Sequence, residues 1–133
     1  MSWQPAAVIH PDIELWGTGY LRAALAGRSE PYAANVFVSN GVPSTRRARM
    51  VTVRRDGGAD DGLFDVPRVN VGVWAATEAD VINLTRLVVA LLKASPDGEP
   101  VTQARMVGGP VAIPDAQPRR SMTFEFRTRG EAL

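Results

Sequence analysis

The strongest constraint on the fold is a strand pattern that leads directly into a helix pattern in the second half of the chain. Within Arg68–Trp74 every second residue is a valine, which predicts a strand with one buried face. Thr77 then begins a helix that ends near Ala94, because its hydroxyl can cap a backbone N–H in the first turn and acidic residues follow there. The apolar residues of this helix form a stripe for burial against a sheet, namely Val81, Leu84, Leu87, Val88, Leu91 and Leu92.

Patterns in the rest of the chain complete a sheet with helices. Pro11-Asp12 opens a helical pattern that runs to about Ala26 and stops at Gly27. Polar, glycine-rich composition predicts a long exposed loop at Asp56–Pro67, and prolines with glycines predict a second loop at Gly108–Pro118. Asp60, Asp61 and Asp65 of the first loop are expected to be solvated, because their spacing lacks the calcium-loop pattern. Alternation at a period of two predicts further strands at Asn35–Ser39, Met50–Arg55, Val101–Val107 and Met122–Arg129. The order α-β-β-β-α-β-β therefore predicts an α+β fold, a mostly antiparallel sheet packed by two helices, in a single domain over residues 1–133.

Charge is segregated in and after the segment Asn35–Gly58, which reads as a hairpin of two short strands joined by an arginine-rich loop. Arg119, Arg120, Arg127 and Arg129 form a second basic group that strand pairing would bring near the first. Three uses of the arginines are consistent with this pattern: solvated strand ends balanced by acids, contact with an acidic protein surface, or contact with DNA phosphate. The candidate contact residues are Arg46, Arg47, Arg49, Arg54, Arg55, Asp60, Asp61 and Asp65.

Composition and motif spacing argue against several function classes. A net charge of +1 excludes a uniformly basic nucleic-acid binder, and the absence of cysteine excludes thiolate chemistry. The single histidine, His10, has no orienting partner or nucleophile suggested by spacing. The glycine pairs lack the context of a phosphate-binding loop. We therefore expect no enzymatic activity, no metal and no cofactor.

The N-terminal stretch and the apolar runs bear on location. The first residues lack the basic and continuous apolar regions of a signal peptide, and the run Leu87–Leu92 is far too short to span a bilayer. These features predict a soluble intracellular protein or part of an assembly, without membrane contact. Trp16, Tyr20 and Trp74 are expected to be packed rather than to stack on bases, because they do not alternate with the arginines.

Three stretches together resemble the tail terminator proteins of long-tailed, non-contractile bacteriophages, particularly those of actinobacterial hosts. They are PDIELWGTGYLRAALA, NVFVSNGVPSTRRARMVTVRRDGG and RVNVGVWAATEADVINLTRLVVALLKASP. The final strand, RRSMTFEFRTRG, is similar too, so the resemblance covers most of the chain. The segment Ala59–Pro67 matches no pattern of these relatives.

The resemblance implies an α+β subunit of a homohexameric ring in the virion, at the head-proximal end of the tail, assembled in the host cytoplasm. Such a ring caps the tail tube protein, ends tube polymerisation and joins the tube to the head-completion or neck proteins, while genomic DNA passes through its lumen. Segregated charge suits a cyclic assembly, in which Arg46–Arg49 of one subunit would meet Asp56–Asp65 of the next. Arginines in the lumen would instead make weak, non-specific phosphate contacts. Two alternatives remain: another head–tail connector, or a small ligand- or nucleic-acid-binding α+β module.

Overall fold

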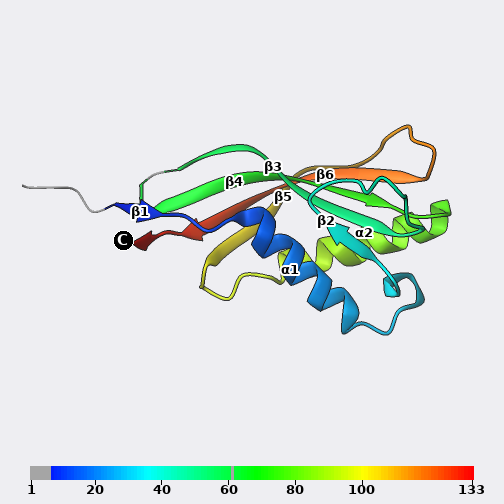
Figure 1. The fold of residues 1–133 in the computed structure, drawn as a ribbon, viewed down its shortest axis with the longest axis horizontal. Helices are drawn as coiled ribbons and strands as arrows, with labels where there is room; N and C mark the ends of the chain where they lie inside the picture. Colours follow the sequence, from blue (N-terminus) through cyan, green and yellow to red (C-terminus); the bar gives the residue numbers. More distant parts are fainter. Residues whose placement is uncertain (1–6, 61) are drawn as a thin grey trace, which may run out of the picture.

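The protein has the expected α+β architecture, seen in a computed structural model that describes residues 7–60 and 62–133. A five-stranded sheet has the strand order β2-β3-β4-β6-β5, and all neighbouring strands are antiparallel except β2 and β3. Its strands are β2 (Phe37–Ser39), β3 (Met50–Asp60), β4 (Phe64–Trp74), β5 (Val101–Ala112) and β6 (Arg119–Arg129). The short strands β1 (Val8–Ile9) and β7 (Glu131–Ala132) pair separately near the two ends of the chain (Figure 1).

Both expected helices form, and they lie on the same side of the sheet (Figure 1). Helix α1 (Ile13–Ala26) packs on β2 and β3, while α2 (Glu78–Lys93) packs on β4, β5 and β6. Asp12 caps α1 by accepting two backbone N–H bonds at 3.1 Å, and Thr77 caps α2 by accepting one. A short 3-10 helix, η1 (Pro31–Ala33), follows α1. The start and end points of both α-helices confirm the capping signals in the sequence.

Alternation along the strands divides the sheet into two faces. The inner face carries Val69, Val71 and Val73 of β4 with Met122, Phe124 and Phe126 of β6, all buried against the helices in the main core. Trp16 of α1 contacts Phe126 edge-on at 5.6 Å between ring centroids and stacks on Tyr20. The outer face carries the intervening residues and has no helix over it. This arrangement confirms the expected burial of the α2 stripe and of the last strand.

The expected hairpin at Asn35–Gly58 is wrong. Strands β2 and β3 are parallel, with Val38 opposite Val51, so the connection between them carries the chain back to the end of the sheet where β2 began. Asn35 has a positive φ of 53°, and the strand begins only at Phe37. The period-two pattern indicates strands but not their relative direction, which explains the error.

The long exposed loop expected at Asp56–Pro67 is also wrong. Strand β3 continues to Asp60, and β4 begins at Phe64, so the two strands form a long hairpin. A bulge between Arg55 and Gly58 interrupts the ladder, and Gly57 and Gly58 both have φ above +90°. At Gly58 a Cβ would lie 2.2 Å from the carbonyl oxygen of Val66, so glycine is required there. Glycines that suggested a loop instead permit a bulged strand.

The loop expected at Gly108–Pro118 is half strand. Strand β5 extends to Ala112, with register irregularities between Met106 and Val111, and only the segment from Ile113 to Pro118 connects it to β6. The β3–β4 and β5–β6 turns lie at opposite ends of the long axis of the molecule (Figure 1). The β5–β6 turn lies level with the start of α2, where Arg120 of β6 donates to Glu78.

Candidate functional site

The outer face of the sheet has one covered end, where two large side chains are buried outside the main core. Met50 and Trp74 lie opposite each other on β3 and β4, and Trp74 is only 2% exposed. The Trp74 ring lies over Gly72, where a Cβ would be 2.7 Å from the ring. The arginine-rich β2–β3 connection contributes to this cover, since the Arg47 N–H lies 3.5 Å from the Met50 sulfur. We call this region the covered end.

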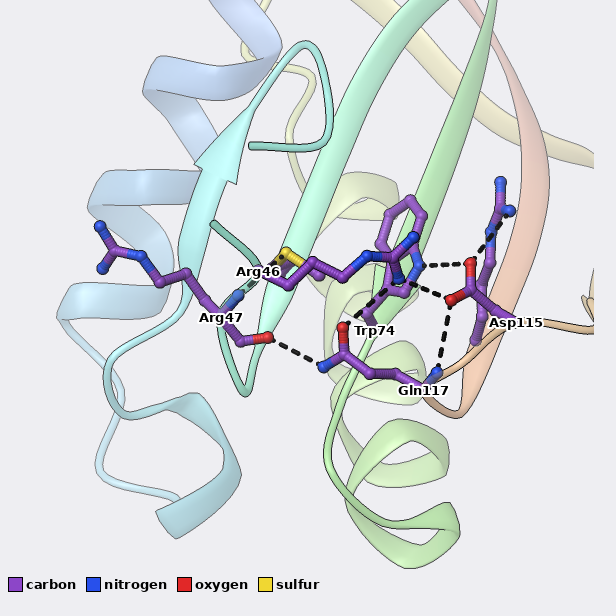
Figure 2. A network of polar contacts seen from close by, with 7 residues as sticks. Arg46, Arg47, Trp74, Asp115 and Gln117 are labelled. Carbon is purple, nitrogen blue, oxygen red and sulfur yellow. Dashed lines mark hydrogen bonds and ion pairs between the residues drawn. The ribbon is translucent and has the colours of Figure 1, made fainter. Parts of the chain in front are cut away.

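Asp115, in the β5–β6 connection, joins the parts of the covered end (Figure 2). Its carboxylate accepts a hydrogen bond from Arg46 at 2.5 Å and one from Trp74 Nε1 at 3.3 Å. Arg119 forms an ion pair with it at 3.6 Å and lies over the Trp74 ring, 4.7 Å from the centroid. Gln117 donates its backbone N–H to Asp115 and its side-chain amide to the Arg47 carbonyl. We call these five side chains (Arg46, Trp74, Asp115, Gln117 and Arg119) the Asp115 clasp.

Asp115 is held ionised by its donors. Burial alone would raise its pKa, but hydrogen bonds from Arg46, Trp74 and the Gln117 backbone outweigh that effect and lower the pKa from 3.8 to about 2. The interaction is therefore fully present above pH 3.8 and is lost as the pH falls through about 2. At neutral pH the clasp ties the arginine-rich connection to the β5–β6 connection.

The remaining arginines of the connection also have contacts within the chain. Arg49 donates to Asp80 of α2 at 2.8 Å and to the Ala34 carbonyl at 2.9 Å. The Arg47 guanidinium lies 5.3 Å from the centroid of the Phe37 ring. The sequence cluster Arg46–Arg49 thus holds a connection without regular structure against the sheet and α2.

Arg55 and Asp65 form a pair on the inner side of the β3–β4 hairpin. Arg55 donates to both carboxylate oxygens of Asp65, at 2.6 and 3.0 Å, and this raises the pKa of the guanidinium. Asp65 is 3% exposed, which places it among the buried residues rather than in a solvated loop. Asp60 is exposed and accepts the Gly62 N–H, while Asp61 lies outside the described residues. Asp65, which we expected to meet Arg46–Arg49 of a neighbouring subunit, is thus paired with Arg55 of its own chain.

Beyond the covered end the outer face is open to solvent. Arg54, Arg68, Arg105 and Arg127 lie exposed there on four different strands, and we call this region the open face. Glu125 lies among them and pairs with Arg105 at 2.9 Å and with Arg68 at 3.7 Å. Among the residues that the structure describes, the Arg54 side chain has no hydrogen-bond or ion-pair partner. Asp56 and Asp60 lie at the hairpin side of this face, lining a hollow with Arg68 and Glu125.

The second basic group of the sequence is divided between the ends of β6. Arg119 joins Arg46 at Asp115, so one member does meet the first group. Arg120 points to the helix side and donates to Glu78 at 2.6 Å. At the other end the Arg127 and Arg129 guanidinium groups lie 3.9 and 5.8 Å from the centroid of the Phe64 ring. Asp115 and Gln117, which organise the site, carried no sequence signal beyond being polar residues in an expected loop.

Within residues 7–60 and 62–133 no group of three or more potential metal ligands is found, and no helix is long and apolar enough to cross a membrane. The Nδ1 atom of His10 is buried beside Gly130 without a hydrogen-bond partner in that part of the chain. Comparison with protein-family models and with curated proteins gave no match.

Proposed function

We propose that this chain is a subunit of a bacteriophage tail terminator, a ring that caps the finished tail tube and ends its polymerisation. Its other face would join the head-completion or neck proteins, and DNA would pass through the lumen. The observation that carries the proposal is the fold: one sheet covered by helices on a single face, in the element order compatible with that family. The role is structural, in the virion, without catalysis, cofactor or membrane.

The β2 edge of the sheet is covered by side chains of α1, and this supports a cyclic assembly. Arg22 of α1 donates to the Val38 carbonyl of β2 at 3.0 Å, and the Arg55 N–H of β3 donates to the Glu14 carboxylate at 2.7 Å. Side chains thereby satisfy backbone groups that would otherwise accept another strand. The β2 edge therefore does not readily pair with a strand from another subunit.

The opposite edge is different. Strand β5 pairs with β6 on one side and, among the described residues, has no strand on the other. Its second half, Val107–Ala112, is continuously exposed and uncharged. A ring uses heterologous contacts, in which one surface of each subunit meets a different surface of the next. Two unlike edges on opposite sides of the sheet provide such surfaces.

The charge of the open face supports the proposal that DNA passes along it. Its arginines are exposed, belong to separate strands and are partly balanced by Glu125, so phosphate contacts there would be weak and screened. Weak contacts let a polyanion slide instead of being held. If the open face lines the lumen, the helices face outward.

The proposal is tested by adding the purified chain to growing tail tubes. We expect tube elongation to stop, with the chain bound at one end only. The variant Asp115→Asn, which weakens the fold, shows how much capping activity is lost through instability alone. Bovine serum albumin controls for crowding. Tubes that keep growing at the same rate would contradict the proposal. Binding at the portal side, with another ring between chain and tube, would show instead the alternative role of a neck connector.

A further inference from the structure

Glu125 lies inside the group of four arginines on the open face. In its own row across the sheet, it is opposite Arg68 of β4 on one side and Arg105 of β5 on the other. Arg127 follows two residues later on β6 and therefore projects from the same face. Arg54 of β3 lies in the adjacent row. One carboxylate is thus placed among all the exposed arginines of this face.

The two carboxylate oxygens of Glu125 face different arginines. Arg105 donates from Nε and Nη2 to Oε1, at 3.2 and 2.9 Å. On the other side, the Nε atom of Arg68 lies 3.7 Å from Oε2. Two neighbouring N–H groups of a guanidinium are also what a phosphate binds in the bidentate arrangement. Glu125 therefore occupies in Arg105 the donors that a phosphate would use.

Stability alone gives little reason for a carboxylate at this position. Glutamate is depleted in β-strands, and ion pairs of exposed arginines contribute little to folding. The side chains of Arg68 and Arg105 are 56% and 62% exposed. In the adjacent row Asn70 and Thr123 are opposite each other, so uncharged polar side chains fit the middle of the face. The negative charge of Glu125 is what sets it apart, and it opposes the approach of a polyanion.

We propose that Glu125 sets the strength of phosphate binding on the open face, because it competes with the DNA backbone for Arg68 and Arg105. The inference rests on the proposed function, in which DNA moves past this face. Arg54 and Arg127 are free of carboxylates and make the weak, screened contacts. Arg68 and Arg105 bind a phosphate only when Glu125 releases them. DNA is thereby contacted without being held.

Retention of mixed-sequence duplex DNA by the purified chain, measured over a range of salt concentrations, tests this competition. Glu125→Gln should raise the apparent affinity at low salt by at least about threefold. It should also steepen the dependence of log affinity on log salt by about one to two counterions, since two arginines become available. Glu125→Asp keeps the charge and should stay close to wild type.

Glu30→Gln is the matched control. Glu30 pairs with Arg28 directly after α1, on the helix side of the sheet (Figure 1), and its side chain is 25% exposed against 20% for Glu125. The variant removes the same charge and also breaks an arginine pair, so it should leave DNA retention close to wild type. An equal rise in Glu30→Gln would show that net charge governs retention, and would overturn the inference.

A double variant tests whether the gain comes through the released arginine. Adding Arg105→Ala to Glu125→Gln should remove about half of the gain in salt dependence, and a gain that persists in full would overturn the competition. Unchanged DNA retention in Glu125→Gln would also overturn it, and tube capping by the wild-type chain would then leave the proposed function standing. Wild-type chain that does not cap tubes would overturn the proposed function, whatever the DNA result.

Discussion

The covered end and the open face of the same sheet use arginine in opposite ways. At the covered end Arg46 and Arg119 share Asp115 and enclose Trp74, so their charge serves the fold. On the open face Arg54 and its neighbours extend from separate strands into solvent. The arginines that cluster in the sequence are thus mainly structural, while those that gather in space come from four strands. Clustering along a chain is a poor guide to which charges face a partner.

Removing the aromatic ring from the covered end should have the largest effect. Trp74→Ala deletes a side chain that is 2% exposed, and we expect a loss of about 3–5 kcal/mol in the free energy of unfolding. Urea unfolding followed by circular dichroism measures it. A loss below about 1 kcal/mol would mean that this end of the outer face adds little to stability, and the contrast between the regions would fail.

Removing the acceptor from the clasp comes next. Asp115→Asn leaves Arg46 and Arg119 without their carboxylate, and we expect a loss of about 1–3 kcal/mol in unfolding free energy. Glu125→Gln is the matched control on the open face, because that carboxylate also bridges two arginines but is more exposed than Asp115, 20% against 9% for the side chain. We expect it to cost less than about 1 kcal/mol. Equal losses of unfolding free energy in the two variants would mean that arginine pairs stabilise the covered end and the open face to the same extent.

The stability difference between wild type and Asp115→Asn should depend on pH in one window only. Because the folded-state pKa is lowered from 3.8 to about 2, the wild-type advantage is complete above pH 3.8 and disappears as the pH falls through about 2. Urea midpoints measured from pH 7 to pH 2 follow this difference. A constant difference down to pH 2 would show that packing, and not the charge of Asp115, supports the clasp.

The smallest stability effect is expected on the open face. Arg54→Ala should change the free energy of unfolding by less than about 0.5 kcal/mol, since this side chain has no partner among the described residues. It should nevertheless lower the salt dependence of non-specific DNA retention by about one counterion. Arg49→Ala breaks the contact with Asp80, so it should lower the free energy of unfolding more than Arg54→Ala does and leave the salt dependence of DNA retention unchanged. Identical DNA retention by wild type and Arg54→Ala would place DNA elsewhere.

Local signals in the sequence were sufficient for the helices and for the inner face. Asp12, Thr77 and Gly27 mark helix ends through contacts within a few residues, so no tertiary information is needed. The alternation of valines with other residues in β4 likewise reflects one buried face. These features are set by nearest neighbours along the chain, which is why they could be predicted.

The outer face could not be predicted because long-range contacts create it. Nothing near Asp115 in the sequence indicates Arg46 or Trp74, which reach it only through the sheet and the β2–β3 connection. The parallel direction of β2 and the bulge at Gly58 likewise depend on how distant segments return. Assigning Asp65 to a solvated loop failed for the same reason, since Arg55 reaches it across the hairpin.

The most direct test of the account is electron microscopy of tail tubes after the purified chain is added. We expect one closed ring of copies at a single end of each tube, with helices outward and the open face toward the lumen. Bare tube ends, or the chain bound along the tube wall as single copies, would contradict the claim that it is a tail terminator.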